Sequence, residues 1–318
     1  MWKFLYGAFA AMLVAASPAL AQQQYSIATG GTGGVYYPLG GGMANVLTQA
    51  LPGFAFTAEV TGGSVDNLKL VGSGKPYFAL TMADAALDAR QGHNKLKGHK
   101  VPVSTLAVLY PNTMHVVTTE SSGIKTMADL KGKRVTTGSP RSATEVMAFR
   151  VIEAAGLDKD KGMTRERLGA SESANAVKDG KIDAFFFVAG VPTSAITDLG
   201  ATPGTKMKIL DIADLTDKMN KKYGNLYAKG VIKAHAYPGI EKDVQIIDVW
   251  NLLVANESMP EKVAYDIVKT IFEKKPQLVA THKAAEDIKL EYQTADRSPL
   301  PYHPGAAKYF AEKGIKLK

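Results

Sequence analysis

The sequence predicts an α/β fold with two lobes. After the first 21 residues, short apolar strands alternate with helical patterns, the arrangement typical of mixed sheets covered by helices. Four turns rich in glycine, serine or proline each follow a strand and precede a helix. Two long strand-like runs, Val103–Thr119 and Val244–Ala255, are suited to crossing between lobes. We therefore expect two α/β lobes joined by a two-strand hinge, with a ligand cleft between them.

The first 21 residues have the pattern of a secretory signal peptide. Lys3 supplies the positive charge, Phe4–Ala16 an apolar run too short to span a bilayer, and Ala19-Leu20-Ala21 a small-residue cleavage site. Cleavage after Ala21 gives a mature chain that starts at Gln22, and we expect it in the periplasm. The alternative is an uncleaved amphipathic anchor, which the cleavage site disfavours.

Composition narrows the class of protein. The chain has 318 residues and no cysteine, so we expect about two domains held by their cores without disulfides. The net charge is +8, but lysine and arginine are spread along the chain, which favours a solvated basic surface over nucleic-acid binding. The six histidines show no ligand-spaced pair, and no Gly-x-Ser-x-Gly elbow occurs. We expect no metal, no cofactor and no catalytic residue.

The first lobe is expected to contain three strand–turn–helix units. Its strands are Tyr25–Ala28, Phe54–Val60 and Tyr77–Thr81. The first strand enters the glycine-rich turn Gly30–Gly42, and apolar residues at helical spacing follow it. The second ends at Thr61-Gly62-Gly63-Ser64 and the third at Met82-Ala83-Asp84, each before another helical pattern.

The second lobe repeats this arrangement. Its expected strands are Val135–Thr137, Asp183–Val188 and Lys208–Ile212. Ser142 and Glu145 have the spacing of a capping box, so a helix is expected to begin near Ala143. The run Phe185-Phe186-Phe187 favours a core strand over a ligand platform.

The two crossing strands set the expected lobe boundaries. The first, Val103–Tyr110, is expected to break at Pro111-Asn112-Thr113 and to resume as His115–Thr119. Lobe 1 is then 22–112 together with 249–318, and lobe 2 is 113–248. The C-terminal part of lobe 1 is expected to be helical, including Met259–Lys274 and Pro304–Lys313.

The glycine-rich turn is the centre of the expected site. Glycine lets backbone approach a ligand closely, and Pro38 suits the first turn of a helix. The turn therefore presents free amides at a helix N-terminus, where an anion is favoured. It is not a P-loop, and Tyr36 stands where a dinucleotide fingerprint needs its third glycine. The alternative, a merely flexible turn, fits poorly with two adjacent tyrosines, of which at least one is expected to serve packing only.

Turns from both lobes are expected to meet at one cleft, because ligands bind at the carboxyl ends of strands in open α/β sheets. Backbone amides and positive helix ends favour a carboxylate or a similar anion. The candidate amides are Gly33, Gly34 and Val35, with Ala189 and Gly190 in the fourth turn. The candidate side-chain donors are Thr32, Tyr36, Ser64, Asn67, Ser139 and Ser142.

Three charged or hydroxyl residues in the turns have two interpretations. Arg141 could hold a carboxylate bidentately, or it could be an exposed loop arginine. Ser64 and Asp84 could contact the ligand, or they could only cap the helices that follow them.

Five segments resemble the TAXI family of solute receptors, which serve tripartite ATP-independent periplasmic (TRAP) transporters. They are Ile27–Gly40, Thr61–Leu68, Leu130–Val135, Thr137–Pro140 with Thr144-Glu145, and Phe186–Gly190. The resemblance spans the mature chain in the family's order. It implies a type II periplasmic-binding-protein fold, a ligand of the glutamate, glutamine or 2-oxoglutarate class, and delivery to an ion-gradient-driven TRAP permease.

This chain departs from the family pattern at two places, and the resemblance adds three residues to the candidate ligand-binding set. The family usually has glycine where this chain has Arg141 and Ala143, and glutamine is common where Met82 stands, which suggests a changed ligand. By position in the family pattern, Met82, Asp84 and Thr144 join the candidate ligand-binding residues. We expect a monomer that binds a small organic carboxylate. Two alternatives stay open, a periplasmic sensor for a membrane signalling protein and a periplasmic enzyme.

Overall fold

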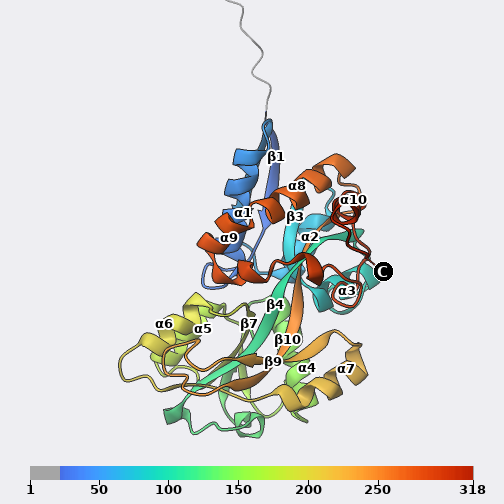
Figure 1. Ribbon diagram of the computed structural model, residues 1–318. Coiled ribbons are helices and arrows are strands. Elements are labelled where there is room, and N and C mark those ends of the chain that lie inside the picture. Colours follow the sequence, from blue (N-terminus) through green and yellow to red (C-terminus); the bar gives the residue numbers. More distant parts are fainter. Residues whose placement is uncertain (1–21, 318) are drawn as a thin grey trace, which may run out of the picture.

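The computed structural model describes residues 22–317, and the expected signal peptide lies outside them. Figure 1 shows two α/β lobes, one above the other, with two long strands running through both. No helix among residues 22–317 is long and apolar enough to cross a membrane. The predicted two-lobed α/β architecture is therefore confirmed.

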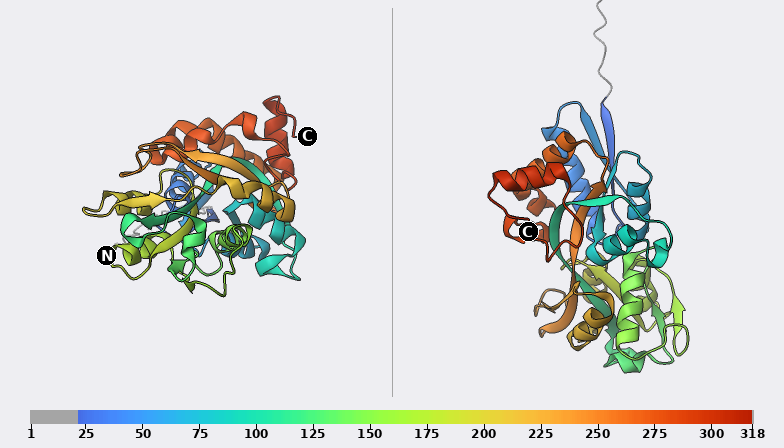
Figure 2. Two further views of the ribbon diagram at one scale, coloured as in Figure 1. Left: turned by 90° about the horizontal axis from the view of Figure 1, so that it is seen from below. Right: turned by 90° about the vertical axis from the view of Figure 1, so that its right-hand side faces the viewer.

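Lobe 1 is built from three parallel strands and the helices that follow them. Its N-terminal elements are β1 (Gln23–Ala28), α1 (Tyr36–Ala50), β2 (Phe54–Glu59), α2 (Ser64–Gly72), β3 (Tyr77–Met82) and α3 (Ala83–Gln91). β1 lies between β2 and β3 and is parallel to both. The C-terminal helices α8 (Glu261–Glu273), α9 (Lys275–Thr281) and α10 (Pro304–Glu312) return to this lobe, as Figures 1 and 2 show.

Two antiparallel strands connect the lobes. β4 (Val103–Thr119) and β10 (Val244–Asn256) pair with each other. β10 pairs with β3 over residues 251–255, and it pairs with β9 (Tyr227–Ile232) over residues 244–249. β4 pairs over residues 113–118 with β7 (Ala184–Ala189) of the other lobe. Each long strand is thus hydrogen-bonded into both lobes.

The expected break in the first crossing strand is wrong, because β4 is continuous through Pro111. Pro111 lies opposite Trp250, beside a register shift between Trp250 and Leu252. Proline has no amide hydrogen to donate, and strands tolerate it where a bulge already interrupts the ladder. The irregular pairing therefore accommodates Pro111 without ending the strand.

The predicted lobe boundaries fall between two neighbouring register pairs of the crossing strands. Asn112 on β4 lies opposite Val249 on β10, and Thr113 lies opposite Asp248. The boundaries 112/113 and 248/249 therefore cut both strands at the same level. They stay a prediction, since the two strands are continuous through them.

Lobe 2 contains elements that the sequence predicted and others that it did not. The further elements of this lobe are β5 (Arg134–Thr136), α4 (Ala143–Ala154), β6 (Thr164–Glu166), α5 (Ala170–Lys178), α6 (Ser194–Ala201), β8 (Met207–Ile209) and α7 (Thr216–Tyr223). β6, β9, α5 and α7, and α9 of lobe 1, were not expected. β6 has three residues, too few to show an alternating pattern. α5 is preceded by Gly169, which has no side chain and so cannot cap the helix.

All the strands belong to one sheet. Its path is β2-β1-β3-β10-β4-β7-β5-β6, while β8 pairs with β4 and β9 with β10. Short 3₁₀ turns complete the chain at Asn94–Leu96, Glu120–Ser122, Met127–Leu130, Ala213–Leu215, Lys283–Asp287 and Leu290–Tyr292.

The core interpretation of the phenylalanine run holds for its first two residues. Phe185 and Phe186 are buried on opposite faces of β7, since successive side chains of a strand alternate. Phe185 packs in the cluster that contains Ala174 and Ile196 of α5 and α6, and Phe186 packs in the cluster that contains Met147 of α4. Phe187 is only partly buried.

The crossing strands carry a carboxyl group whose ionisation opposes folding. Thr113 donates a hydrogen bond to Asp248 Oδ1 at 2.6 Å, and burial raises the pKa of Asp248 to about 6 against the opposing effect of that bond. A raised folded pKa contributes stability below the unfolded pKa, and this contribution is lost as pH rises through about 6. Asp248→Asn keeps an acceptor for Thr113 and removes the charge. We expect Asp248→Asn to raise the melting temperature by a few degrees at pH 7.5 and to change it little at pH 4.

Thermal melts at the two pH values check this expectation. The exposed Asp243 is the control, because its hydrogen bond from Lys233 lowers the pKa of its carboxyl, so Asp243→Asn should not stabilise at pH 7.5. An equal gain from Asp248→Asn at both pH values would show that ionisation of Asp248 is not the cause.

Candidate ligand-binding site

A cavity of about 440 Å³ lies between the lobes. This volume is in the range of small-molecule sites. Lobe 1 lines it with the turns that follow β1 and β2 and with Met82 at the end of β3. Lobe 2 lines it with the turns that follow β5 and β6 and with the last residues of β7. The ends of strands from both lobes therefore meet at one cavity, as the sequence predicted.

The glycine-rich turn forms one wall. Its predicted residues Thr32, Gly33, Gly34, Val35 and Tyr36 all line the cavity. The turn closes on itself where Gly34 donates to the Gly31 carbonyl at 3.2 Å, and α1 begins directly after it with no side-chain cap. The first amides of α1 therefore have no intrahelical acceptor. They point towards the N-terminus of the helix, which is the end that faces the cavity.

Gly33 is also a contact between the lobes. Its carbonyl accepts from Ser194 Oγ at 3.0 Å and from Ala195 N at 3.3 Å, both in the first turn of α6. A Cβ at Gly33 would overlap Ser171 Oγ and would lie 3.3 Å from Ala195 Cβ. The close approach of lobe 2 thus requires glycine here.

A buried hydrogen-bond chain fixes the α6 terminus that meets Gly33. His115 Nδ1 lies 3.2 Å from the Phe187 carbonyl, and His115 Nε2 lies 2.9 Å from the Tyr237 hydroxyl. That hydroxyl accepts from the amide of Thr193, the residue before α6, at 3.0 Å. Burial lowers the pKa of His115 to about 4, so the ring is neutral near pH 7, with Nδ1–H donating and Nε2 accepting.

The two adjacent tyrosines have different roles. Tyr36 lines the cavity and donates its hydroxyl hydrogen to Asn251 Oδ1 on β10. Burial raises the pKa of Tyr36 above its usual value, so the phenol stays neutral. Tyr37 is 38% exposed and does not line the cavity. Asn112 of β4 also lines the cavity, beyond the predicted set.

Ser64 and Met82 line the cavity as expected, and they are tied to each other. The Met82 amide donates to Ser64 Oγ at 3.2 Å. Ser64 is the first residue of α2, and Gly63 occupies the capping position, so the capping alternative for Ser64 is wrong.

In lobe 2, the predicted residues Ser139, Ser142, Thr144 and Ala189 line the cavity. Ser142 caps α4, since its Oγ accepts from the Glu145 amide at 3.1 Å and donates to the Ser139 carbonyl at 2.7 Å. The predicted helix start at residue 143 is confirmed. The amide of Thr144, in the first turn of α4, is therefore available beside the cavity.

Several lining residues were missed because α5 was missed. Arg167, Gly169, Ser171 and Glu172 lie in or just before its first turn and line the cavity. The available signal was weak: a glycine before the helix and a glutamate in its first turn, without a Ser, Thr, Asp or Asn cap. Phe187, interpreted from the sequence as core, lines the cavity as well.

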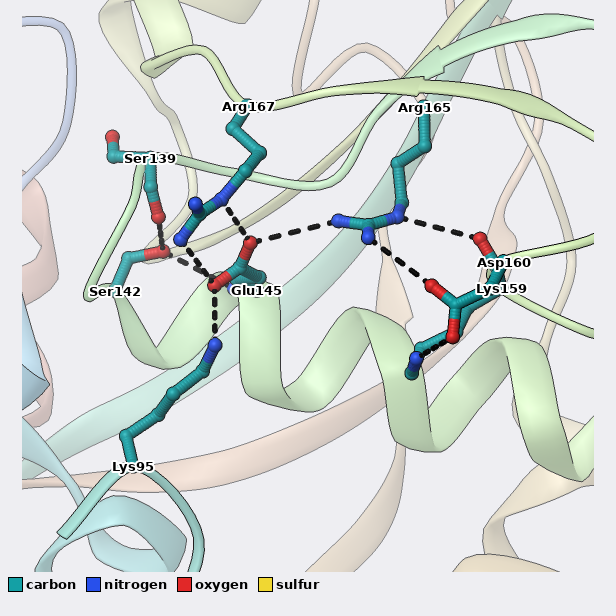
Figure 3. A network of polar contacts seen from close by, with 8 residues as sticks. All are labelled: Lys95, Ser139, Ser142, Glu145, Lys159, Asp160, Arg165 and Arg167. Atoms are coloured by element: carbon teal, nitrogen blue, oxygen red, sulfur yellow. Dashed lines mark hydrogen bonds and ion pairs between the residues drawn. The ribbon is translucent and has the colours of Figure 1, made fainter.

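Figure 3 shows the charged network beside this wall. Glu145 is almost fully buried and accepts from Arg167 Nε at 2.5 Å and Nη2 at 3.1 Å. Lys95, from lobe 1, reaches the same carboxylate at 3.0 Å, and Arg165 lies 3.7 Å from it. One carboxylate thus organises three cations from both lobes.

Four predicted residues do not line the cavity. Asn67 is fully buried, and its Nδ2 donates to three carbonyls, of Ala28, Thr29 and Leu80. It joins the ends of β1 and β3 and supports the site from behind. Gly190 packs against the Tyr110 ring. A Cβ added to Gly190 would lie 2.9 Å from Cε2 of that ring.

Asp84 is a structural residue that joins the lobes. It is fully buried and accepts from Arg150 Nη1 of α4 at 3.1 Å and from the Tyr227 hydroxyl at 2.8 Å. Burial raises the pKa of Asp84, and the Arg150 guanidinium opposes that rise. Asp88 holds Nη2 of the same arginine at 2.6 Å. Asp84 therefore neither binds in the cavity nor serves only as a cap.

Arg141 agrees with the second of its two interpretations, an exposed loop arginine. Its Nε lies 3.0 Å from Asp66 Oδ1 of lobe 1, and its side chain is 64% exposed. Its backbone is left-handed, with φ of 64°. The guanidinium is thus engaged by a protein carboxylate at the rim, where one of the two interpretations placed a ligand carboxylate. The lobes are thus in contact at Gly33 and at the Arg141–Asp66 and Arg150–Asp84 ion pairs.

Comparison with known proteins places the chain in a family and a fold class. The NMT1-like family matches residues 27–314. MatC from Rhodopseudomonas palustris, solved with bound malate, is similar with a TM-score of 0.57 at 13% identity over 91% of this chain and 97% of that one. A structure of a periplasmic transporter is similar with a TM-score of 0.54 at 14% identity over 93% of each chain. The fold is that of two-lobed periplasmic binding proteins.

The glycine contact between the lobes gives a test of closure. We expect Gly33→Ala to hold the lobes apart, because its Cβ would meet Ser171 and Ala195. Small-angle scattering of the ligand-free protein should give a larger radius of gyration than wild type. Gly31→Ala is the matched control, because no atom lies within 4 Å of a Cβ there. Identical scattering from the Gly33 variant and wild type would contradict this account of closure.

The rim pair Arg141–Asp66 gives a second test. Exposed ion pairs contribute about 0–1 kcal/mol, so Arg141→Ala should weaken ligand binding by no more than about fivefold. Asp66→Ala should have the same effect, and the double variant should be no worse than either single one. Calorimetric titration with a carboxylate ligand measures all three. A tenfold loss in Arg141→Ala alone would place the arginine on the ligand.

Proposed function

This chain belongs to the NMT1-like family, and we propose that it is an extracytoplasmic receptor that takes a small organic carboxylate into the cleft between its lobes. One observation carries the proposal. The N-termini of α1, α2, α4 and α5, two from each lobe, meet at a single cavity. Each terminus offers unpaired amides and the positive end of a helix dipole, which together favour an anion.

The remaining lining suits a small, partly apolar molecule. Hydroxyl donors come from both lobes, including Thr32, Ser64 and Ser139, while Met82 and Phe187 supply apolar surface. Neutral donors recognise a carboxylate without the desolvation cost of a fully buried ion pair. The cavity of about 440 Å³ has room for an acid of about the size of glutamate.

The arrangement of the lobes supports a capture-and-release cycle. Both lobes share β4 and β10, so rotation about these strands would open and close the cavity. The closed pair of lobes then forms a surface that a membrane partner can distinguish from the open one. The signal-peptide pattern supports a periplasmic location, and the resemblance to TAXI receptors supports a TRAP permease as that partner.

A thermal-shift screen tests the ligand class. The protein is unfolded and refolded first, which removes any co-purified ligand. We expect at least one of L-glutamate, L-glutamine, 2-oxoglutarate and glutarate to raise the melting temperature by several degrees. A ligand at a hundred times its Kd stabilises by about 2.7 kcal/mol through mass action. Glucose, which has no carboxylate, is the control.

The screen also has a clear negative result. A melting temperature that rises with glucose, and with none of the acids, would overturn the carboxylate assignment. An acid that binds and is recovered chemically unchanged would argue for a receptor, whereas turnover of that acid would establish an enzyme.

A further inference from the structure

We infer that Arg167 binds the anionic group of the ligand and thereby orients the ligand with that group towards lobe 2. The inference rests on the proposed function and deepens it. Arg167 lies between β6 and α5 and lines the cavity. Among residues 22–317, the sequence-predicted arginine of the site, Arg141, is at the rim, so the cationic side chain on the cavity wall is Arg167.

The Arg167 guanidinium is held in place by Glu145, and some of its N–H groups remain free to donate to a ligand. Glu145 accepts from Nε at 2.5 Å and from Nη2 at 3.1 Å, and it is the sole polar partner of Arg167 within the described part of the chain. An arginine has five N–H groups, so three remain for a ligand. Because Glu145 is almost fully buried at the start of α4, it fixes the arginine without occupying the cavity.

The charge balance around Glu145 favours an added anion. Figure 3 shows six ionised side chains in one network: Lys95, Lys159, Arg165, Arg167, Glu145 and Asp160. Four are cations and two are carboxylates, so the network carries an excess of two positive charges. The Arg167 side chain is 44% exposed, so its charge is accessible from the cleft. A carboxylate at this point would reduce the excess.

The backbone on both sides of Arg167 adds to the same effect. α5 begins three residues after Arg167, and α4 begins at Ala143 across the same wall. Both helix N-termini present amides and a positive dipole end. An anionic group bound by Arg167 would therefore also lie near the unpaired amides of two helices, such as those of Thr144 and Ser171.

One lining group opposes the anion. Glu172 is exposed in the first turn of α5 and also lines the cavity. Its negative charge is favoured by the dipole of α5, but it repels a ligand carboxylate. The sign of its effect is therefore fixed: neutralising Glu172 should tighten anion binding.

Affinity measurements on matched arginine variants test the inference. The probes are 2-oxoglutarate, L-glutamate and L-glutamine, titrated calorimetrically into refolded protein. We expect Arg167→Ala to weaken binding of the tightest probe tenfold or more, the loss expected for charge-assisted hydrogen bonds. Arg165→Ala is the control, since it removes a cation from the same Glu145 network but does not line the cavity. It should weaken binding less than threefold.

A second comparison separates direct contact from an effect on folding. Glu172→Gln should bind the same probe about twofold to threefold more tightly, which a destabilised fold would not do. Melting temperatures of the ligand-free variants show whether each is folded. If Arg167 contacts the side-chain carboxylate of L-glutamate, the difference in affinity between L-glutamate and its amide L-glutamine should also shrink in Arg167→Ala relative to wild type.

The possible failures are distinguishable. Wild-type protein that binds none of the three acids and no glutarate would refute the proposed carboxylate function itself. Wild-type protein that binds a probe, together with a folded Arg167→Ala variant of equal affinity, would refute only the role of Arg167. Equal losses in Arg165→Ala and Arg167→Ala would show that both act through Glu145, and this too would overturn the inference.

Discussion

The antiparallel pairing of β4 with β10 is the constraint on which the rest of this structure depends. Each strand is hydrogen-bonded into both lobes, so neither lobe can turn without changing the geometry of this pair. The pairing brings the carboxyl ends of β1, β2 and β3 to face those of β5, β6 and β7. Helices begin after most of these strand ends, so their N-termini converge on one space. The anion-favouring character of the cavity is therefore a consequence of topology more than of any one side chain.

The contacts between the lobes differ greatly in the energy that they carry. Arg141 and Asp66 meet at an exposed rim, where an ion pair contributes little. Arg150 is buried between Asp84 and Asp88, and removing one partner of such a cluster typically costs about 3–5 kcal/mol because a charge is left unpaired. Lys95 and Glu145 are intermediate, with the carboxylate buried and the lysine partly exposed. The closed arrangement is thus held most firmly on the α3–α4 side and most weakly at the rim.

The sequence was most informative at the turns and least informative about single polar side chains. A strand, a glycine-rich or serine-rich turn and a helix are local patterns, and the residues of these turns line the cavity from Thr32 to Tyr36 and at Ser139 and Ser142. Asn67, Asp84 and Arg141 lie close to such turns in sequence, yet their side chains bond to protein groups. Whether a polar side chain meets a ligand or a distant carbonyl depends on partners that are far apart in the chain. Arg167 was missed for a different reason. The helix α5 has no side-chain cap, so the turn that precedes it and holds Arg167 could not be recognised from the sequence.

By itself, the sequence determined the alternation of strands and helices, the two long crossing strands and the helix start at Ala143, because these follow from side-chain periodicity and local capping. Tertiary structure alone decided that β4 runs on through Pro111, that Phe187 faces the cavity, and that Glu145 gathers cations from both lobes. The strand tolerates Pro111 because the pairing is irregular beside Trp250, which lies opposite the proline only in the folded sheet. Likewise, the buried carboxylate of Glu145 acquires Arg165 and Arg167 only when lobe 2 folds, and it acquires Lys95 only when lobe 1 lies against lobe 2.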